Sequence, residues 1–520
     1  MSGARPSFVT VSAGQLRLWC AGHGAPVIVL PGLIRAAQVA CESLTALLPG
    51  RTLCAIELPG IGASSSPAIC TLDSIAQMLA EAIDGAGLAG APVVAFDLAA
   101  PLALRLPNVG QRVFPGLDAA CAWAKQGLQP PDLSARDDGA HLTALFAHLR
   151  DCHVLDPEGS RCAARAGAPL PDAEALDAMM VTAGFRPAQY AALWAVCLEA
   201  VGALVRHPSP TLDQLANALG DPVGDDGPTL PSARPQAGIW RDYVDLPRGR
   251  AHLRRCGMTG RALIALHSAP AGSAPLGHLL EGLGSSRSVI APDFIGNGDS
   301  TRPDHPVDIA RLGQDVIELA DALNLQEFDL WGTHTGALVA LEAAIQAPGR
   351  VGRVVLEAPP LLSPAFAADL LANYFPPLEP DGWGLYLQKA WNLRRDMFLF
   401  WPWYRMERAA ARPLPVPEAD FLHDWVIGLL TSGRTYHRSY RAAFEYDTRE
   451  RLPHLRVPVM LCAGPADMLA DALVTARPLL RDDAVIAATP ATVWYPEQGQ
   501  QAIAETIAMY QRFLDGPSIR

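Results

Sequence analysis

The order of predicted strands, turns and helices in the second half of this 520-residue chain also occurs in its first half. The second half contains an apolar strand, a strand with a Gly-rich turn, an amphipathic helix and a strand ending in a turn of small residues: RALIALHSAP, SVIAPDFIGNGDSTRP, VDIARLGQDVIELADALN and FDLWGTHTG. The first half has PVIVLPG, LCAIELPGIGASSSP, TLDSIAQMLAEAIDGAG and PVVAFDLAA in the same places. A repeat of this length and order predicts two tandem units of one architecture.

Strands that alternate with helices predict an α/β fold, with a mainly parallel sheet in each unit and helices on both faces. After the last shared strand of each half comes a helical segment, at about 120–205 and again at about 362–452. In sheets of this kind, ligands bind at the carboxyl ends of the strands. We therefore expect each helical segment to form a cap above that edge.

The two halves differ after their caps. The second half continues with VPVMLCAGPADM, AVIAAT and QQAIAETIAMYQRFL, which predict two more strands and a helix. The first half has no such strands and passes into a segment rich in Pro, Gly and Asp, which indicates a linker. We predict a truncated unit at 1–205, a linker at 206–236 and a complete unit at 237–520.

Composition excludes several classes of partner. The net charge is −12 without a run of Lys or Arg, which argues against nucleic acid, because phosphate binding requires clustered basic residues. The start, MSGARPSFVT, has no apolar signal core and no stretch is long and apolar enough to span a bilayer, so we expect a cytoplasmic protein without membrane contact. The ten cysteines form no CxxC pair, and GNGDS is too short for a dinucleotide loop. We expect neither a metal nor a cofactor.

The turn Gly332-Thr333-His334-Thr335-Gly336 has the spacing of a nucleophile elbow, a sharp strand-to-helix turn that raises its central residue above the sheet. That residue is normally Ser, Cys or Asp, but here it is His334. The equivalent position of the first half is Asp97, flanked by alanines instead of glycines.

Four motifs of the second half, LHSAP, DFIGNGDSTRP, WGTHTGA and CAGPADM, resemble those of the α/β-hydrolase fold superfamily. The similarity is to its capped members: epoxide hydrolases, haloalkane dehalogenases and C–C bond hydrolases. The resemblance implies a nucleophile at the elbow, then an acid, then a histidine. Asp467 in GPADM takes the acid position. Thr492 stands where the histidine belongs, and no histidine follows His454.

The resemblance implies a cofactor-independent enzyme that hydrolyses an ester, a lactone or a C–C bond. His334 would be a general base held by Asp467, with the backbone N–H groups of Ala269 and Thr335 as an oxyanion hole. A lyase or isomerase that uses His334 as its base is the first alternative. The second is an inactive protein that binds a ligand or partner, in which the elbow is a relic. Asp97 is a possible second site or a polar remnant.

The second cap contains an aromatic run around Trp401, Trp403 and Tyr404. With Thr333 beside the elbow, these side chains are candidates for a pocket that takes a small apolar or aromatic molecule. The alternative is that the aromatic side chains form the interior of the cap. Two halves of one architecture also leave a homo-oligomer open.

Overall fold

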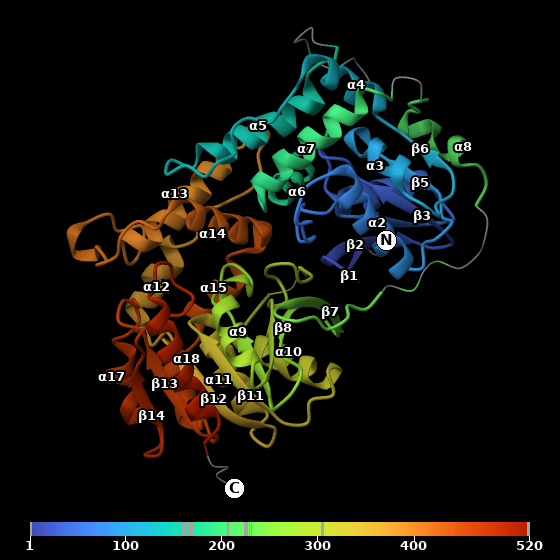
Figure 1. The fold of residues 1–520 in the computed structure, drawn as a ribbon. Coiled ribbons are helices and arrows are strands. Elements are labelled where there is room, and N and C mark those ends of the chain that lie inside the picture. Colours follow the sequence, from blue (N-terminus) through green and yellow to red (C-terminus); the bar gives the residue numbers. More distant parts are fainter. Residues whose placement is uncertain are drawn as a thin grey trace. The chain divides into compact units, whose positions relative to one another are not determined.

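The computed structural model describes residues 3–158, 163, 170–204, 207–222, 227, 229, 231–302 and 306–516. The chain forms two compact units (Figure 1). Unit 1 consists of Met1–Arg234 with Pro380–Gln388, and unit 2 of Pro235–Glu379 with Lys389–Arg520. In the described part of the chain, no helix is long and apolar enough to cross a bilayer.

Unit 2 contains an eight-stranded sheet in the order β14-β13-β12-β11-β9-β10-β8-β7. Its strands are β7 (Trp240–Leu246), β8 (Gly249–Cys256), β9 (Ala262–Leu266), β10 (Ser288–Pro292), β11 (Phe328–Thr333), β12 (Val351–Glu357), β13 (Val459–Ala463) and β14 (Val485–Ala488). The strands from β10 to β14 are parallel, and β7 and β8 add an antiparallel edge. Every residue of β9, β11 and β13 is buried, as expected for strands covered on both faces.

Helices cover both faces of this sheet. On one face lie α10 (Ile309–Ala322) and α11 (Thr335–Gln346), and on the other α9 (Gly277–Gly284) and α18 (Gln500–Leu514). The α10 helix starts at the cap residue Asp308, whose side chain accepts the N–H of Arg311. Its buried residues recur at helical spacing and face the sheet. The predicted α/β fold class is confirmed for this unit.

The cap of unit 2 lies between β12 and β13. Its helices are α12 (Pro364–Asn373), α13 (Leu385–Leu399), α14 (Ala419–Thr431), α15 (Arg438–Glu445) and α16 (Thr448–Arg451). The α13 helix belongs to unit 2 from Lys389 onward. Side chains from α13, α14 and α15 border the same cavity as residues that follow β9 and β11. The cap therefore covers the carboxyl ends of the central strands.

Unit 1 contains a six-stranded sheet in the order β1-β2-β4-β3-β5-β6. The strands are β1 (Arg5–Val11), β2 (Gly14–Gly22), β3 (Ala25–Leu30), β4 (Arg51–Ile56), β5 (Val93–Ala95) and β6 (Arg112–Val113). The first six strands of unit 2 are arranged in the same order. Among the described residues of unit 1, no strand follows β6.

The helices of unit 1 are α1 (Ala37–Leu47), α2 (Leu72–Gly85), α3 (Ala100–Arg105), α4 (Leu117–Gln126), α5 (Ala140–Val154), α6 (Ala173–Gly184), α7 (Pro187–Val201) and α8 (Leu215–Leu219). The α8 helix lies within the expected linker, yet Leu215 and Leu219 are buried in the core beside α1 and β3. The Arg51 side chain also donates to the Gly220 carbonyl at 2.6 Å. This part of the segment is therefore packed onto unit 1, because two leucines four residues apart give α8 an apolar face.

Candidate active site

The elbow is built from a strand end, a strained residue and a helix start. β11 ends at Thr333 and α11 begins at Thr335, with His334 between them at φ 49° and ψ −115°. A non-glycine residue in such a region costs about 1–3 kcal/mol and persists only where the surroundings enforce it. The flanking glycines permit the turn: a Cβ added to Gly332 would lie 2.2 Å from the Gly336 carbonyl oxygen, and one on Gly336 would lie 2.1 Å from that of Leu266.

The structure brings His334 and Asp467 together. The His334 Nε2 lies 2.8 Å from the Asp467 Oδ2, and both residues are buried. The other carboxylate oxygen of Asp467 accepts the N–H of Leu469 at 2.8 Å, which fixes its orientation. A carboxylate only accepts hydrogen bonds, so His334 donates from Nε2. In the neutral ring Nδ1 then carries a lone pair, and it has no hydrogen-bond partner among the described residues.

Thr492, the residue expected at the histidine position, lies in the loop between β14 and α18. Thr492 is buried, and its Oγ1 has no hydrogen-bond partner in the described structure. The other histidine at the cavity is His267, which follows β9. Its Nε2 accepts the N–H of Phe294 at 3.1 Å, and its Nδ1 lies 2.8 Å from the Ser268 carbonyl. Burial lowers the pKa of His267, and both nitrogens are engaged, so His267 is a structural residue.

Of the two predicted oxyanion donors, Thr335 lies in the elbow and Ala269 in the loop after β9. Ala269 is three residues beyond β9, and Thr335 is the first residue of α11. Neither backbone N–H has a hydrogen-bond partner among the described residues. The first N–H groups of a helix lack internal partners, so this edge favours developing negative charge.

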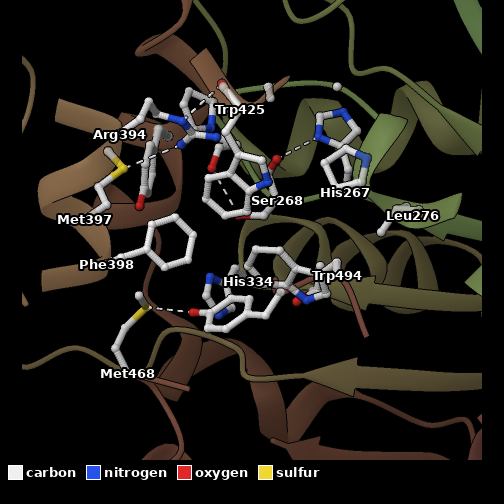
Figure 2. Close-up of a pocket in the computed structure, with 18 of the residues that line it drawn as sticks. His267, Ser268, Leu276, His334, Arg394, Met397, Phe398, Trp425, Met468 and Trp494 are labelled. Carbon is white, nitrogen blue, oxygen red and sulfur yellow. Dashed lines mark hydrogen bonds between the residues drawn. The ribbon is translucent and has the colours of Figure 1, made fainter. Parts of the chain in front are cut away.

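A cavity of about 50 Å³ lies above the elbow (Figure 2). Its floor comes from the strand ends and its roof from the cap: His267, Ser268, Ala269, Pro270, Ala271, Gly272, Pro275, Leu276, Thr333, His334, Tyr374, Arg394, Met397, Phe398, Arg412, Trp425, Tyr440, Met468, Trp494 and Tyr495. This volume accommodates only a few water-sized groups, so a larger ligand requires the surrounding side chains of the cap to move apart. The cavity therefore suits a small molecule.

The predicted aromatic residues of the cap lie beside this cavity without lining it. Trp401, Trp403 and Tyr404 pack around Tyr374, with ring centroids 5.9, 6.1 and 6.2 Å from its ring. Tyr374 itself borders the cavity, as does Thr333. The three aromatic residues are half-buried and pack on Tyr374 beside the cavity.

Glu357 is a component of the site that was not predicted from the sequence. It is the last residue of β12, fully buried, and accepts hydrogen bonds from the Trp494 Nε1 at 2.9 Å and the Tyr510 hydroxyl at 2.8 Å. Burial raises the pKa of Glu357, although these hydrogen bonds oppose the effect. Trp494 in turn packs edge-on against His334, with ring centroids 5.1 Å apart. The sequence feature that indicates Glu357 is an acidic residue at the end of an apolar strand, RVVLE.

One group of side chains is spaced to hold a cation: His252, Asp293 and Asp299. The Asp293 carboxylate already accepts hydrogen bonds from the Ser273 N–H and hydroxyl and from the Asp299 N–H, and it contacts His252 at 2.9 Å. Burial opposes its ionisation, but contacts with His252 and Arg254 outweigh burial and hold the pKa of Asp293 well below its usual range. Its bonds tie β8 to the turn after β10, which is a structural role.

The family model for the alpha/beta hydrolase fold matches residues 261–399. Unit 2 has the α/β-hydrolase fold. A 2-hydroxymuconate semialdehyde hydrolase of Pseudomonas putida is 37% identical over 116 residues, 22% of this chain and 38% of that protein. A proline iminopeptidase of Heyndrickxia coagulans is 31% identical over 136 residues, 25% of this chain and 47% of that protein. The matched segments thus span less than half of both relatives.

Among solved structures, the enol-lactonase from Burkholderia xenovorans LB400 is similar to 53% of this chain and 100% of its own length. Its sequence identity to this chain is 21% and the TM-score is 0.40.

In unit 1, Asp97 occupies the position that His334 has in the α/β-hydrolase fold of unit 2. It has φ 40° and is buried. Its Oδ1 accepts the N–H groups of Leu33 at 3.2 Å and Leu98 at 2.6 Å, and its Oδ2 pairs with Arg35 at 2.5 Å. Leu33 is three residues beyond β3 and Leu98 follows the elbow, so these donors correspond to Ala269 and Thr335. The Asp97 carboxylate therefore occupies both backbone donors at this turn.

We expect Asp97→Ala to lower the free energy of unfolding of unit 1 by about 1–3 kcal/mol. The substitution leaves two backbone donors and the Arg35 guanidinium without their acceptor, although Arg35 keeps some access to water. Urea unfolding measures the loss, with the exposed Asp84→Ala as the matched control. An Asp97→Ala protein that unfolds at the same urea concentration as Asp84→Ala would contradict this structural role.

Proposed function

We propose that unit 2 is a cofactor-independent hydrolase of a small ester, lactone or C–C bond substrate, with His334 as its general base. The observation that carries the proposal is the 2.8 Å contact between the His334 Nε2 and the Asp467 Oδ2 at a strained elbow. Asp467 holds the proton on Nε2, which leaves the Nδ1 lone pair to accept another. A positioned base of this kind accelerates proton-transfer steps by about 10²–10⁴-fold.

The position of Nδ1 supports water activation. In a serine elbow, Oγ is bonded directly to Cβ; in His334, Nδ1 is one bond farther along the side chain. Nδ1 takes a proton from a water molecule while the water oxygen bonds to the substrate carbonyl carbon. The N–H groups of Ala269 and Thr335 stabilise the resulting oxyanion. When the carbonyl re-forms and the leaving group departs, the proton passes from Nδ1 to the leaving group.

This chemistry forms no covalent enzyme intermediate. We therefore expect that a serine-directed fluorophosphonate does not label the elbow, because position 334 has no hydroxyl group. Intact-protein and peptide mass spectrometry check this, with a serine hydrolase labelled in parallel. A phosphonyl group on Thr333 or Thr335 would show that a neighbouring threonine is the nucleophile.

The direct test is turnover by purified full-length protein on a panel of p-nitrophenyl esters and lactones. We expect the activity of the wild-type protein to fall at least about 100-fold in His334→Ala. The control is His454→Ala, which removes an exposed histidine of the same unit. Activity that survives His334→Ala would show that His334 is not the general base. Ligand binding without turnover in the wild-type protein would favour a binding function, and proton exchange at a substrate carbon without hydrolysis would favour an isomerase or lyase.

Unit 1 is proposed to be non-catalytic. The Asp97 carboxylate is engaged by Arg35 and by two backbone N–H groups. A carboxylate whose lone pairs are occupied in this way is a poor nucleophile.

A further inference from the structure

Arg394 is a buried cation without a carboxylate partner. It lies on α13, is only 4% exposed and borders the cavity above His334. Its Nε donates to the Trp425 carbonyl at 3.2 Å, and its Nη1 contacts the Met397 sulfur at 3.5 Å. The guanidinium carbon lies 4.3 Å from the centre of the Trp425 ring. Among the described residues, no Asp or Glu forms an ion pair with it.

An arrangement of this kind is costly in the free protein. Charged side chains are rarely fully buried unless they are paired, because the interior solvates them poorly. Burial lowers the pKa of Arg394 to about 10, although Tyr440 and Tyr374 oppose the effect. At neutral pH the side chain is still charged. A ligand that brings a negative charge would recover the lost solvation.

A second guanidinium borders the same cavity. Arg412 donates to the Met397 carbonyl at 2.7 Å, the Ala466 carbonyl at 3.1 Å and the Tyr495 hydroxyl at 3.2 Å. These partners are neutral, and no described carboxylate pairs with Arg412 either. The cavity lining thus contains two arginines and no acidic residue. This balance of charges favours a negatively charged ligand.

The aromatic side chains of the cavity determine which kind of molecule can carry the negative charge. Trp425 and Trp494 are parallel, with an interplanar angle of 7° and ring centroids 6.0 Å apart. Phe398 lies against Trp425 at 4.8 Å. In Figure 2, Arg394 and Trp425 are drawn on the cap side of the cavity, and His334 and Trp494 on the side of the sheet. The two indoles are stacked on each other, which leaves no space for a ring between them, so together they form one aromatic wall. A planar apolar body fits against such a wall, because aromatic surfaces stack with rings and conjugated chains.

We propose that this cavity binds a small carboxylic acid with a planar apolar body, and that Arg394, with Arg412, holds its carboxylate. A guanidinium matches a carboxylate in geometry and can donate two parallel hydrogen bonds to it. The carboxylate would then lie against the cap and the planar body against the aromatic wall, on the side of His334. The inference that such an acid is also the substrate rests on the proposed function of unit 2. The inference that the cavity binds the acid does not rest on it.

The test uses isothermal titration calorimetry of the full chain with benzoate, benzamide and inorganic phosphate. We expect benzoate to bind at least about tenfold more tightly than benzamide, which has the same body without the charge. Benzoate should also bind more tightly than phosphate, which has charge without an apolar body. Equal affinity for benzoate and benzamide would overturn the charge recognition. Equal affinity for benzoate and phosphate would show a general anion site.

The matched variants are Arg394→Met and Arg395→Gln. We expect Arg394→Met to weaken benzoate binding by about 10- to 150-fold, the range for a lost charge-assisted hydrogen bond. Without ligand, the same variant should melt at a higher temperature, because it removes an uncompensated buried charge. Arg395, which pairs with Asp396 beside the cavity lining, is the control and should bind as the wild type does. An Arg394→Met protein that melts lower and still binds benzoate would show that Arg394 is only structural.

The same titrations separate this inference from the proposed function. His334→Ala should keep the preference for benzoate over benzamide, since that preference depends on the charge of Arg394 and not on proton transfer. If His334→Ala stays active while Arg394→Met no longer binds benzoate, His334 is not the general base and the proposed ligand class stands. If Arg394→Met binds benzoate normally while His334→Ala is inactive, the ligand class is refuted and the base stands.

Discussion

His334→Ala, Asp467→Asn and the double variant are expected to lose nearly the same activity, each about 10²–10³-fold in kcat. The two side chains share one hydrogen bond, and residues that act as a unit give strongly non-additive losses. Asparagine keeps the size of Asp467 but presents no carboxylate to fix the proton on Nε2. Steady-state kinetics of the four proteins, with folding checked by circular dichroism, measure the coupling. Losses that multiply in the double variant would mean that Asp467 does not act through His334.

Gly336→Ala is expected to lower the free energy of unfolding of unit 2 by about 3 kcal/mol or more, the size typical of a backbone clash in a core. The new Cβ would lie 2.1 Å from the Leu266 carbonyl oxygen and 2.7 Å from that of His267. These are backbone atoms of β9 and of the loop that carries Ala269, so relief requires the elbow to move. Any turnover should fall with stability, because His334 and the oxyanion donors lose their relative positions.

Gly349→Ala is the control for this substitution, since nothing lies within 4 Å of its added Cβ. Chemical denaturation of both variants measures the difference. If Gly336→Ala proves as stable as Gly349→Ala, the close approach of the elbow to β9 is not as described.

The sequence indicated the elbow and suggested Asp467 as the partner of His334. The spacing of Gly332 and Gly336 around His334 has one steric explanation, a turn too tight for a Cβ at either flank. Asp467 follows a short apolar strand, and parallel strands end at one edge of a sheet. Topology therefore favoured a contact between the two side chains. The distance of 2.8 Å and the choice of Nε2 required coordinates.

The cap was less predictable because its helices contact the sheet through long-range packing. The aromatic residues Trp401 and Trp403 suggested a pocket, but the chain places them around Tyr374 instead. The sequence also contained an indication of a ligand at Arg394. It lies three residues after Trp391 and four before Phe398, on the buried face of α13. A cation on the apolar face of a helix is an indication of a ligand or a buried partner.

In unit 1, the sequence predicted where Asp97 lies but not what it contacts. Its position at an elbow suggested a nucleophile or a remnant. The structure shows a carboxylate held by Arg35 and by two backbone donors. Arg35 gave no sequence signal because its pairing with Asp97 spans 62 residues and depends on how the loop after β3 folds back.

The most direct test of the account is the ¹⁵N NMR spectrum of histidine-labelled protein, with His334 assigned by the signals lost in His334→Gln. For the neutral ring, the account predicts a proton on Nε2, held by Asp467, and a bare lone pair on Nδ1. In Asp467→Asn this preference should weaken, while the signals of His454 stay unchanged. A neutral His334 that carries its proton on Nδ1 would contradict the account, because Nδ1 would then have no lone pair with which to accept a proton from water.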